Sequence, residues 1–384
     1  MIYLDNNATT RMAPEVREAM LPWMDEFYGN PSGGYRFGKK AKQAMDEARE
    51  KVAALIGSQP DEVVFTSGGT EAINSAIQSG TRQHPNHKIL LASSVEHSAV
   101  FEAFGAMESQ GFETRWCPVD EQGRLDLEQW NQILEGAQVV VANLIWANNE
   151  TGVISPVAEA AAACAEHGAC FHCDAVQAVG KIPISVGELP VHALSMSAHK
   201  FHGPKGVGAV YTHRLSRFTP MFYGGGQEEG RRSGTENVAG IVGMGVAASL
   251  ASEALDSRKR LADMRDDFEN KILDSIEGVE INGGNTERLP NTTNLYFSGV
   301  DGEGLLILLD EAEVCCSPGS ACSTGSIEPS RIIKSMGHSS TRARSSVRFS
   351  FSRYSEAREV DEAVSAVKAA VAKLRVVLPR GVTR

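Results

Sequence analysis

A lysine that could act as a nucleophile lies in the stretch 195–208, Ser-Met-Ser-Ala-His-Lys-Phe-His-Gly-Pro-Lys-Gly-Val-Gly. Lys200 follows a short apolar run, and Gly203, Pro204 and Gly206 behind it argue against a helix. A lysine at the end of a buried strand loses its charge readily, because burial disfavours the ammonium form. The neutral amine can form a Schiff base with an aldehyde. A lysine in such a turn is more often an ordinary surface residue, so the rest of the chain must decide.

Polar side chains follow several other strand-like runs. Asp174 comes directly after the run 170–173, and Gln177 follows three residues later. A buried carboxylate at that place needs a cationic partner, either an arginine or the protonated nitrogen of a pyridine ring. His97 and Asn149 follow two further runs, where each could also be a capping or turn residue.

A glycine turn, Ser-Gly-Gly-Thr-Glu-Ala at 67–72, joins a strand-like run to a helical one. The free amides and the dipole at a helix N-terminus suit a phosphate group, although an ordinary helix cap is the simpler interpretation of this segment alone. Taken together, Lys200, Asp174, this turn and the planar ring of His97 offer a Schiff-base amine, a partner for a ring nitrogen, an anion cradle and a stacking surface. Those are the requirements of pyridoxal phosphate (PLP).

The elements that must position these residues alternate between strand-like and helical runs. This alternation predicts an α/β fold with a mostly parallel, seven-stranded sheet covered by helices on both faces. In such sheets ligands bind beyond the carboxyl ends of the strands, where the polar residues lie. The strand-like runs are 62–66, 88–92, 113–117, 139–144, 170–173, 191–196 and 207–211. The helical runs are 14–25, 37–56, 71–79, 99–110, 127–134 and 157–166.

The chain of 384 residues is too long for one hydrophobic core, which stops growing at roughly 250–300 residues. We predict a large domain over 14–257 and a smaller α+β domain made of 1–13 and 258–384. The arm 1–13 reads as irregular and rich in side-chain hydrogen bonds. The later elements are a helix-rich stretch at 238–276, strands at 292–297 and 347–351, helices at 303–309 and 355–374, and a loop from 317 to about 346.

Composition narrows the class of protein. The net charge of −11 disfavours a direct nucleic-acid binder or a membrane-surface binder. We expect no membrane span, because no run of about 18 apolar residues is evident, and no secretion signal at the N-terminus. The seven cysteines, an odd number, indicate reduced thiols and a cytoplasmic protein. Cys170 and Cys173 have CxxC spacing within a strand, which points them to opposite faces, so no metal site is expected.

Several long motifs carry a resemblance to a known family. The spacing from Asp174 to Ser197-Ala-His-Lys200 resembles that of the class V aminotransferase group of fold-type I PLP enzymes. The run Cys-Cys-Ser-Pro-Gly-Ser-Ala-Cys-Ser-Thr-Gly-Ser-Ile-Glu-Pro-Ser at 315–330 resembles the active-site loop of NifS/IscS-type cysteine desulfurases. The stretches 3–10, 224–235 and 345–350 resemble further motifs of that family, and the likeness runs from residue 2 to about 374. It implies a fold-type I PLP-dependent transferase.

The resemblance also implies roles for single residues. Lys200 would hold PLP as a Schiff base and move protons at the substrate Cα, with His97 stacked on the ring and available as an acid or base. Asp174 would pair with the ring nitrogen, and Gln177 would hydrogen-bond the phenolic oxygen. The phosphate cradle would be formed by Gly69, Thr70, Ser197 and His199, and by Thr235 of the neighbouring subunit in a homodimer. Arg348 would bind the substrate carboxylate, a task suited to a planar bidentate donor, close to Asn149.

Cys322 matches the nucleophile of the family. The implied reaction removes sulfur from L-cysteine, leaving L-alanine and a persulfide on Cys322 for a sulfur-acceptor protein. That acceptor could be an iron–sulfur scaffold, a tRNA-thiolation enzyme or DNA-phosphorothioation machinery. The alternatives are selenocysteine lyase or aminotransferase chemistry on the same fold, and a sulfur-relay or scaffold protein without catalysis. The joint presence of Lys200, Asp174 and Arg348 favours an enzyme.

Overall fold

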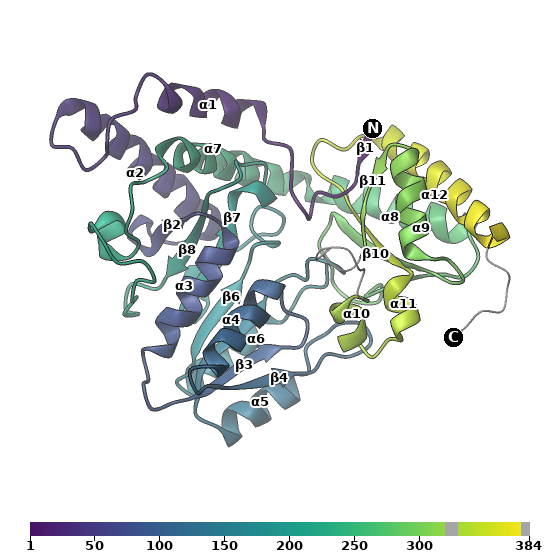
Figure 1. Ribbon diagram of the computed structural model, residues 1–384, viewed down its shortest axis with the longest axis horizontal. Coiled ribbons are helices and arrows are strands. Elements are labelled where there is room, and N and C mark those ends of the chain that lie inside the picture. Colours follow the sequence, from purple (N-terminus) through teal and green to yellow (C-terminus); the bar gives the residue numbers. More distant parts are fainter. Residues whose placement is uncertain (319–328, 378–384) are drawn as a thin grey trace.

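A seven-stranded sheet organises the larger part of the molecule (Figure 1). The computed structural model describes residues 1–318 and 329–377. The strands of this sheet are β2 (Val63–Thr66), β3 (Ile89–Ser93), β4 (Glu113–Cys117), β5 (Val139–Ile145), β6 (Cys170–Asp174), β7 (Ala193–Ser197) and β8 (Gly208–Thr212). Their order is β2-β8-β7-β6-β5-β3-β4, and only β8 runs antiparallel to its neighbours. The predicted sheet is therefore confirmed.

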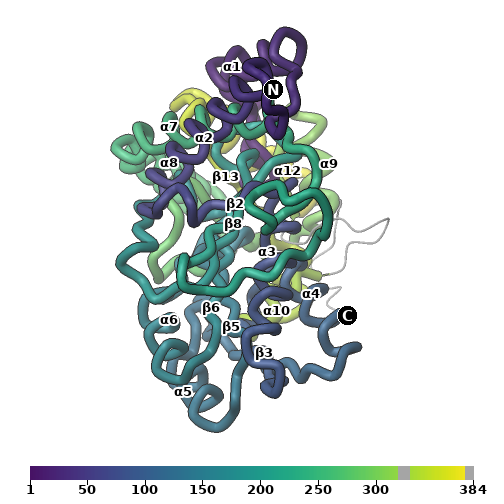
Figure 2. The backbone as a smooth tube through the Cα atoms, turned by 90° about the vertical axis from the view of Figure 1, so that its left-hand side faces the viewer, coloured from purple at the N-terminus to yellow at the C-terminus, as the bar shows by residue number. Residues whose placement is uncertain are grey.

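Helices cover both faces of this sheet. They are α1 (Pro14–Met24), α2 (Arg36–Ile56), α3 (Gly69–Thr81), α4 (Ser98–Glu108), α5 (Leu127–Gly136), α6 (Val157–Glu166) and α7 (Val238–Ala254). Figure 2 shows α2, α6 and α7 on one side of the strands and α3 and α4 on the other. Two separate apolar clusters fill the spaces between these layers, one containing Val52 and Met244, the other Ile77 and Phe104. Because β5 and β6 are buried along their whole length, they read as apolar runs rather than as alternating ones.

A second sheet lies beside the first, in the order β12-β13-β10-β9. It is antiparallel and consists of β9 (Val279–Ile281), β10 (Thr292–Phe297), β12 (Ser317–Pro318) and β13 (Ser346–Ser350). Helices α8 (Arg258–Ser275), α9 (Gly302–Glu311) and α12 (Ala357–Val377) belong to this part (Figure 1). Its apolar core shares no residue with the core of the large sheet.

The N-terminal arm joins the smaller part of the molecule. Strand β1 (Ile2–Tyr3) pairs in parallel with β11 (Val314–Cys315), and the side chains of Ile2 and Leu4 lie in the smaller core. The arm was expected to be irregular, and this two-residue strand is too short to leave a pattern in the sequence. The domain boundaries at 13/14 and 257/258 stay a prediction.

The prediction of a loop from 317 to about 346 is wrong for the residues of this range that the structure describes. Two short helices, α10 (Arg331–Ser335) and α11 (Ser340–Arg344), lie there. Each is capped by a serine: Ser330 Oγ accepts a hydrogen bond from Ile333 N at 3.2 Å, and Ser339 Oγ accepts one from Arg342 N at 3.1 Å. Five-residue helices are too short to show a helical period, which is why the sequence reads as a loop.

One helical stretch bears on the expectation that the chain has no run long and apolar enough to span a membrane. By length and apolar character alone, Val238–Ser275 could cross a membrane, so the expectation of no such stretch is wrong. Within it, α7 packs against α1 and α2, and Met244, Ala247 and Ala248 have no exposed surface. A Cβ on Gly245 would lie 2.6 Å from the Cα of Ala48 in α2. Its small apolar residues therefore serve close helix packing inside the molecule.

Short 3-10 helices complete the described elements. They lie at Pro60–Glu62, Val186–Glu188, Ala198–Lys200, Gln227–Gly230 and Leu255–Ser257. The third of these follows β7 directly and carries Lys200. The sharp turn ends the strand and places the lysine beyond the carboxyl edge of the large sheet, where ligands of parallel sheets bind.

Candidate active site

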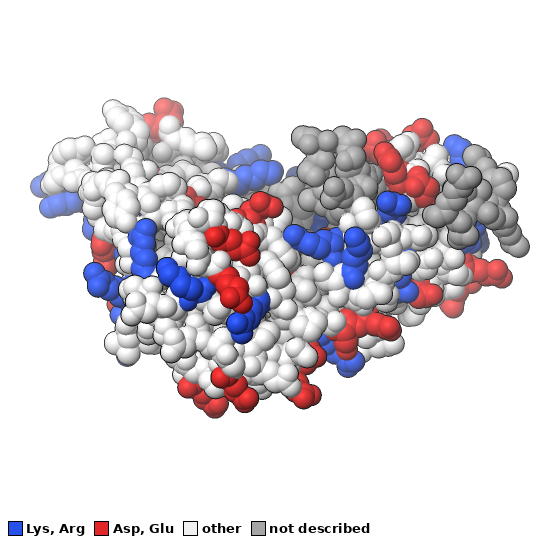
Figure 3. All heavy atoms as spheres, turned by 60° about the horizontal axis from the view of Figure 1, so that its bottom comes forward, with Lys and Arg blue, Asp and Glu red and all other residues white. Residues whose placement is uncertain are grey.

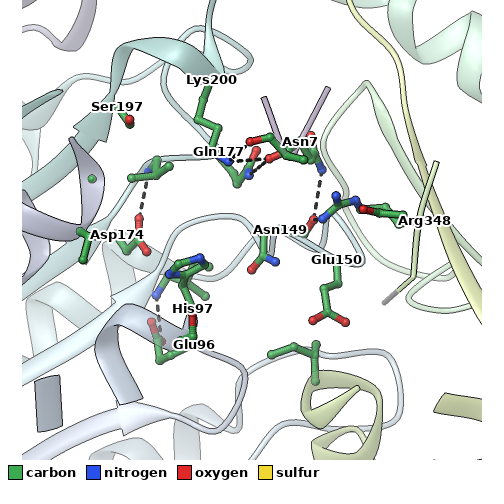
Figure 4. A pocket seen from close by; sticks show the side chains of 18 of the residues that line it. Asn7, Glu96, His97, Asn149, Glu150, Asp174, Gln177, Ser197, Lys200 and Arg348 are labelled. Carbon is green, nitrogen blue, oxygen red and sulfur yellow. Dashed lines mark hydrogen bonds between the residues drawn. The ribbon is translucent and has the colours of Figure 1, made fainter. Parts of the chain in front are cut away.

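A cavity of about 520 Å³ lies where the large sheet meets the smaller part of the molecule (Figure 4). Most of the site residues predicted from the sequence line this one cavity. They are Gly69, Thr70, His97, Asn149, Asp174, Gln177, Ser197, His199, Lys200 and Arg348. The structure therefore brings together residues from both parts of the chain, although their individual roles stay predictions.

Lys200 enters the cavity from the turn after β7. Its Nζ donates hydrogen bonds to the main-chain oxygens of Asn7, at 2.7 Å, and Ala8, at 2.8 Å. Burial, together with the charge of Arg348, lowers the pKa of Lys200 to about 8, although the carboxylate of Asp174 opposes the shift. A lysine with this pKa keeps a useful fraction of neutral amine near pH 7, as a Schiff-base lysine needs.

Asp174 ends β6 and lies beneath the cavity with only 2% of its surface exposed. Its Oδ1 accepts a hydrogen bond from Val176 N at 3.0 Å, the single hydrogen bond of this carboxylate with the described residues. Burial raises the pKa of Asp174, whereas His97 and Lys200 lower it. A buried carboxylate with an unused oxygen beside a cavity fits a ligand that donates an N–H.

His97 caps helix α4 and lines the cavity next to Asp174 (Figure 4). Its Nδ1 accepts a hydrogen bond from Ala99 N at 3.1 Å, so a neutral ring carries its proton on Nε2. Burial lowers the pKa of His97 and favours this neutral form. The helix cap thus fixes both the orientation and the tautomer of a planar ring that faces the cavity.

The N-terminus of α3 forms an anion cradle at one end of the cavity. No side chain caps this helix, and Gly69, Thr70, Ser197 and His199 gather around it. His199 Nδ1 lies 3.1 Å from Thr9 Oγ1, and burial lowers the pKa of His199 to about 4. A Cβ on Gly208 would lie 2.8 Å from the Cα of Gly68, so glycine is required for this close approach of β8 to the turn. Free helix amides in such a turn suit a phosphate.

Arg348 and Asn149 lie on the opposite side of the cavity. Arg348 Nη2 donates to Asp5 Oδ1 at 2.6 Å, and Nη1 donates to Asn149 O at 2.9 Å. The Nε of Arg348 and the Oδ1 of Asn149 are buried, and neither has a hydrogen-bond partner among residues 1–318 and 329–377. Buried polar atoms left unsatisfied beside a cavity indicate a place for a polar ligand.

The sequence did not reveal the part that the N-terminal arm plays. Asn7 lines the cavity, and its main-chain oxygen accepts hydrogen bonds from Lys200 Nζ and from Gln177 Nε2, the latter at 2.9 Å. Asn7 Nδ2 donates to Thr292 Oγ1 at 2.9 Å. The sequence signals in the arm were its density of Asn, Asp and Thr, which indicates hydrogen bonding, and the family likeness of 3–10; neither identified the partners of Asn7.

Two buried glutamates near the cavity were also missed. Glu96 accepts hydrogen bonds from Asn143 Nδ2 at 2.7 Å and from Ile145 N at 2.9 Å, and burial raises its pKa to about 8. Glu150 is hydrogen-bonded to Ser330 Oγ at 2.5 Å, and burial raises its pKa to about 7. Each glutamate adjoins a residue that was predicted, His97 or Asn149, in a polar turn.

Two predicted residues are not in the described cavity. Thr235 lines a different cavity of about 150 Å³, together with Ser67 and Arg232. Cys322 lies outside the described residues.

The described residues still fit PLP: an amine of lowered pKa, a buried carboxylate, a planar ring and an anion cradle surround one space. These residues would hold the aldehyde carbon, the ring nitrogen, the ring face and the phosphate in turn.

Comparisons with known proteins agree with this arrangement. The aminotransferase class-V family model matches residues 2–363. A cysteine desulfurase of Klebsiella pneumoniae is 44% identical over 379 residues, covering 98% of this chain and 94% of that protein. The solved structure of a "NifS-like protein" has a TM-score of 0.90 at 33% identity, covering 97% of this chain and 100% of its own. A structure titled "SspA in complex with cysteine" has a TM-score of 0.81 at 32% identity, covering 93% and 100%.

The likeness therefore extends over the whole chain, in sequence and in fold alike. It includes the strands, turns and arm that surround the cavity. The chain belongs to the class V aminotransferase family and, within it, to the PLP-dependent, NifS-like cysteine desulfurases.

Proposed function

We propose that this enzyme takes sulfur from L-cysteine, releases L-alanine and retains the sulfur as a persulfide on Cys322. The observation that carries the proposal is the convergence of Lys200, Asp174 and Arg348 on one cavity. A nucleophilic amine, a partner for a ring nitrogen and a carboxylate-binding cation are what PLP chemistry on an amino acid requires. The relative named as a complex with cysteine supports L-cysteine as the substrate.

Bound PLP supplies an electron sink for negative charge at the substrate Cα. The carboxylate of Asp174 would keep the ring nitrogen protonated, and Arg348 would hold the substrate carboxylate. The amine of Lys200, once displaced from the cofactor by the substrate, would take the proton from Cα. Burial of these groups excludes water and strengthens their electrostatic interactions.

The sulfur atom would move from the substrate to Cys322 in one displacement. The thiolate of Cys322 attacks the substrate sulfur, so that an S–S bond forms and the Cβ–S bond breaks. The bonding electron pair stays with the substrate carbon skeleton, which takes up protons and leaves as alanine. Sulfur is oxidised to the persulfide level while Cβ is reduced to a methyl group, so no further oxidant or reductant is needed.

The partners belong to the same proposal. We infer a cytoplasmic homodimer in which Thr235 reaches the phosphate of the neighbouring subunit; its place outside the cavity of its own chain supports this. The persulfide would pass to an acceptor protein for iron–sulfur cluster assembly or another sulfur transfer, such as tRNA thiolation. Figure 3 shows basic and acidic side chains interspersed on one face. A nucleic acid is bound by clustered positive charge, and this face does not present such a cluster.

The proposal is tested by mixing the PLP-loaded protein with L-cysteine and measuring alanine, sulfide and protein-bound persulfide. We expect alanine in every turnover, and persulfide that maps to Cys322 when no reductant is present. Light scattering at working concentration tests the dimer. An absence of alanine from L-cysteine would contradict the proposed reaction.

A further inference from the structure

A second lysine, Lys181, lies behind Lys200 and has no part in the mechanism above. Its Nζ donates hydrogen bonds to Gln177 Oε1 at 2.5 Å and to Asn7 Oδ1 at 3.0 Å. It borders a small cavity of about 50 Å³ that also touches Lys200 and lies away from the phosphate cradle. No carboxylate contacts its Nζ among the described residues, so the amine is held by neutral acceptors alone.

These contacts determine which end of the Gln177 amide faces which partner. A main-chain oxygen only accepts, and the Nζ of Lys181 donates to both of its partners. Gln177 must therefore turn its Nε2 toward the oxygen of Asn7, at 2.9 Å, and its Oε1 toward Lys181. The amide nitrogen carries a second N–H, and Gln177 lines the main cavity (Figure 4). The amide thus presents a donor, and not an acceptor, to a ligand.

We propose that Lys181 is a positioning residue that orients and polarises the Gln177 amide so that it donates to the phenolic oxygen of bound PLP. The inference rests on the proposed function, because it concerns the cofactor of the same site. A chain of two hydrogen bonds from Lys181 through Gln177 strengthens the final donor, since each bond polarises the next. Donation to the phenolic oxygen stabilises its negative charge. The phenolate then stabilises the protonated Schiff-base nitrogen between Lys200 and the cofactor less strongly, so the pKa of that nitrogen falls.

The test is a pH titration of the visible absorbance of the PLP-loaded protein, which does not depend on turnover. In Lys181→Met the midpoint is expected to rise by roughly one pH unit. Lys181→Arg, which keeps a donor, is expected to restore most of the wild-type midpoint. Lys205→Met is the matched control, because Lys205 is an exposed lysine of the neighbouring turn, and it should leave the midpoint unchanged.

A double-mutant cycle separates positioning from a general effect of charge or folding. If Lys181 acts through Gln177, Lys181→Met adds no shift in a Gln177→Leu background. An unshifted midpoint in Lys181→Met, or an equal shift in both backgrounds, would overturn the inference. Should Lys181→Met fail to fold, Lys181→Ala, which also removes the donor, carries the same test. A wild-type protein that binds no PLP would instead overturn the proposed function.

Discussion

Asp5 Oδ1 accepts a hydrogen bond from Arg348 Nη2 at 2.6 Å, although the two residues lie 343 positions apart in the chain. Both side chains are largely buried, with 17% and 7% of their surface exposed. Because Arg348 also donates to Asn149 O, the guanidinium is held between the N-terminal arm and the turn after β5. This fixes the plane of the arginine before any substrate arrives, and such preorganisation reduces the entropic cost of binding.

Arg348→Lys tests the role of that plane. Lysine keeps the charge but cannot bind a carboxylate in a bidentate manner. We expect kcat/KM for L-cysteine to fall by about 10- to 100-fold, mostly through KM. Steady-state kinetics of the purified variant measure this split. Arg342→Lys serves as a control, because Arg342 bonds Asn282 and does not line the cavity; an equal loss in both variants would argue against a specific role for Arg348.

The lowered pKa of Lys200 predicts the pH dependence of PLP binding. The neutral amine is the reactive form, so the rate of PLP capture should rise with pH and level off above about pH 8, the pKa of Lys200. An ordinary lysine, with a pKa of about 10.4, would continue to gain rate up to pH 10. Stopped-flow absorbance of the PLP-free protein mixed with PLP measures the profile. A rate that keeps rising tenfold per pH unit between 8 and 10 would contradict the shift.

Removal of the amine gives a simpler outcome. Lys200→Ala should bind PLP without a covalent link. Denaturation should therefore remove the cofactor from this variant even after treatment with borohydride. Mass spectrometry after borohydride reduction distinguishes the two states, with wild type gaining the mass of reduced PLP. Lys205→Ala, an exposed lysine nearby, should still be labelled at Lys200. A labelled Lys200→Ala chain would show that another amine carries the cofactor.

The separate apolar core of the smaller part predicts a local effect on stability. Phe349 is fully buried and its ring lies 5.0 Å from that of Phe268. Phe349→Ala should lower the free energy of unfolding by about 3–5 kcal/mol. If 258–384 folds around its own core with 1–13, calorimetry should show one transition shifted and the transition of 14–257 little changed. A uniform shift of a single transition would argue against the predicted domain boundaries.

Much of the fold and the cavity could be predicted from the sequence, because both depend on patterns within the chain. The run 170–173 followed by Asp174, and the glycine turn before Thr70, place polar groups at strand ends whatever the remaining details. The contacts of Asp5 and Asn7 could not be predicted, because they join an irregular arm to residues far along the chain. Helices α10 and α11 were missed because five residues do not complete two helical turns.

Lys181 illustrates the same limit inside a predicted region. It follows Gln177 by four residues, in a turn whose sequence offers no helical period. Only the fold reveals that both side chains meet Asn7. A polar cluster of three residues that includes a main-chain oxygen depends on the backbone path, and composition carries no information about it.

The central claim, that sulfur leaves L-cysteine for Cys322 at this cavity, is tested most directly by mass spectrometry of the PLP-loaded protein after one turnover with L-cysteine. We predict one equivalent of alanine per site and a mass increase of one sulfur atom on the peptide that contains Cys322. Cys322→Ala should give neither, whereas Cys315→Ala, a cysteine of strand β11, should give both. Alanine formation that persists in Cys322→Ala, or sulfur found on another cysteine of the wild type, would contradict the account.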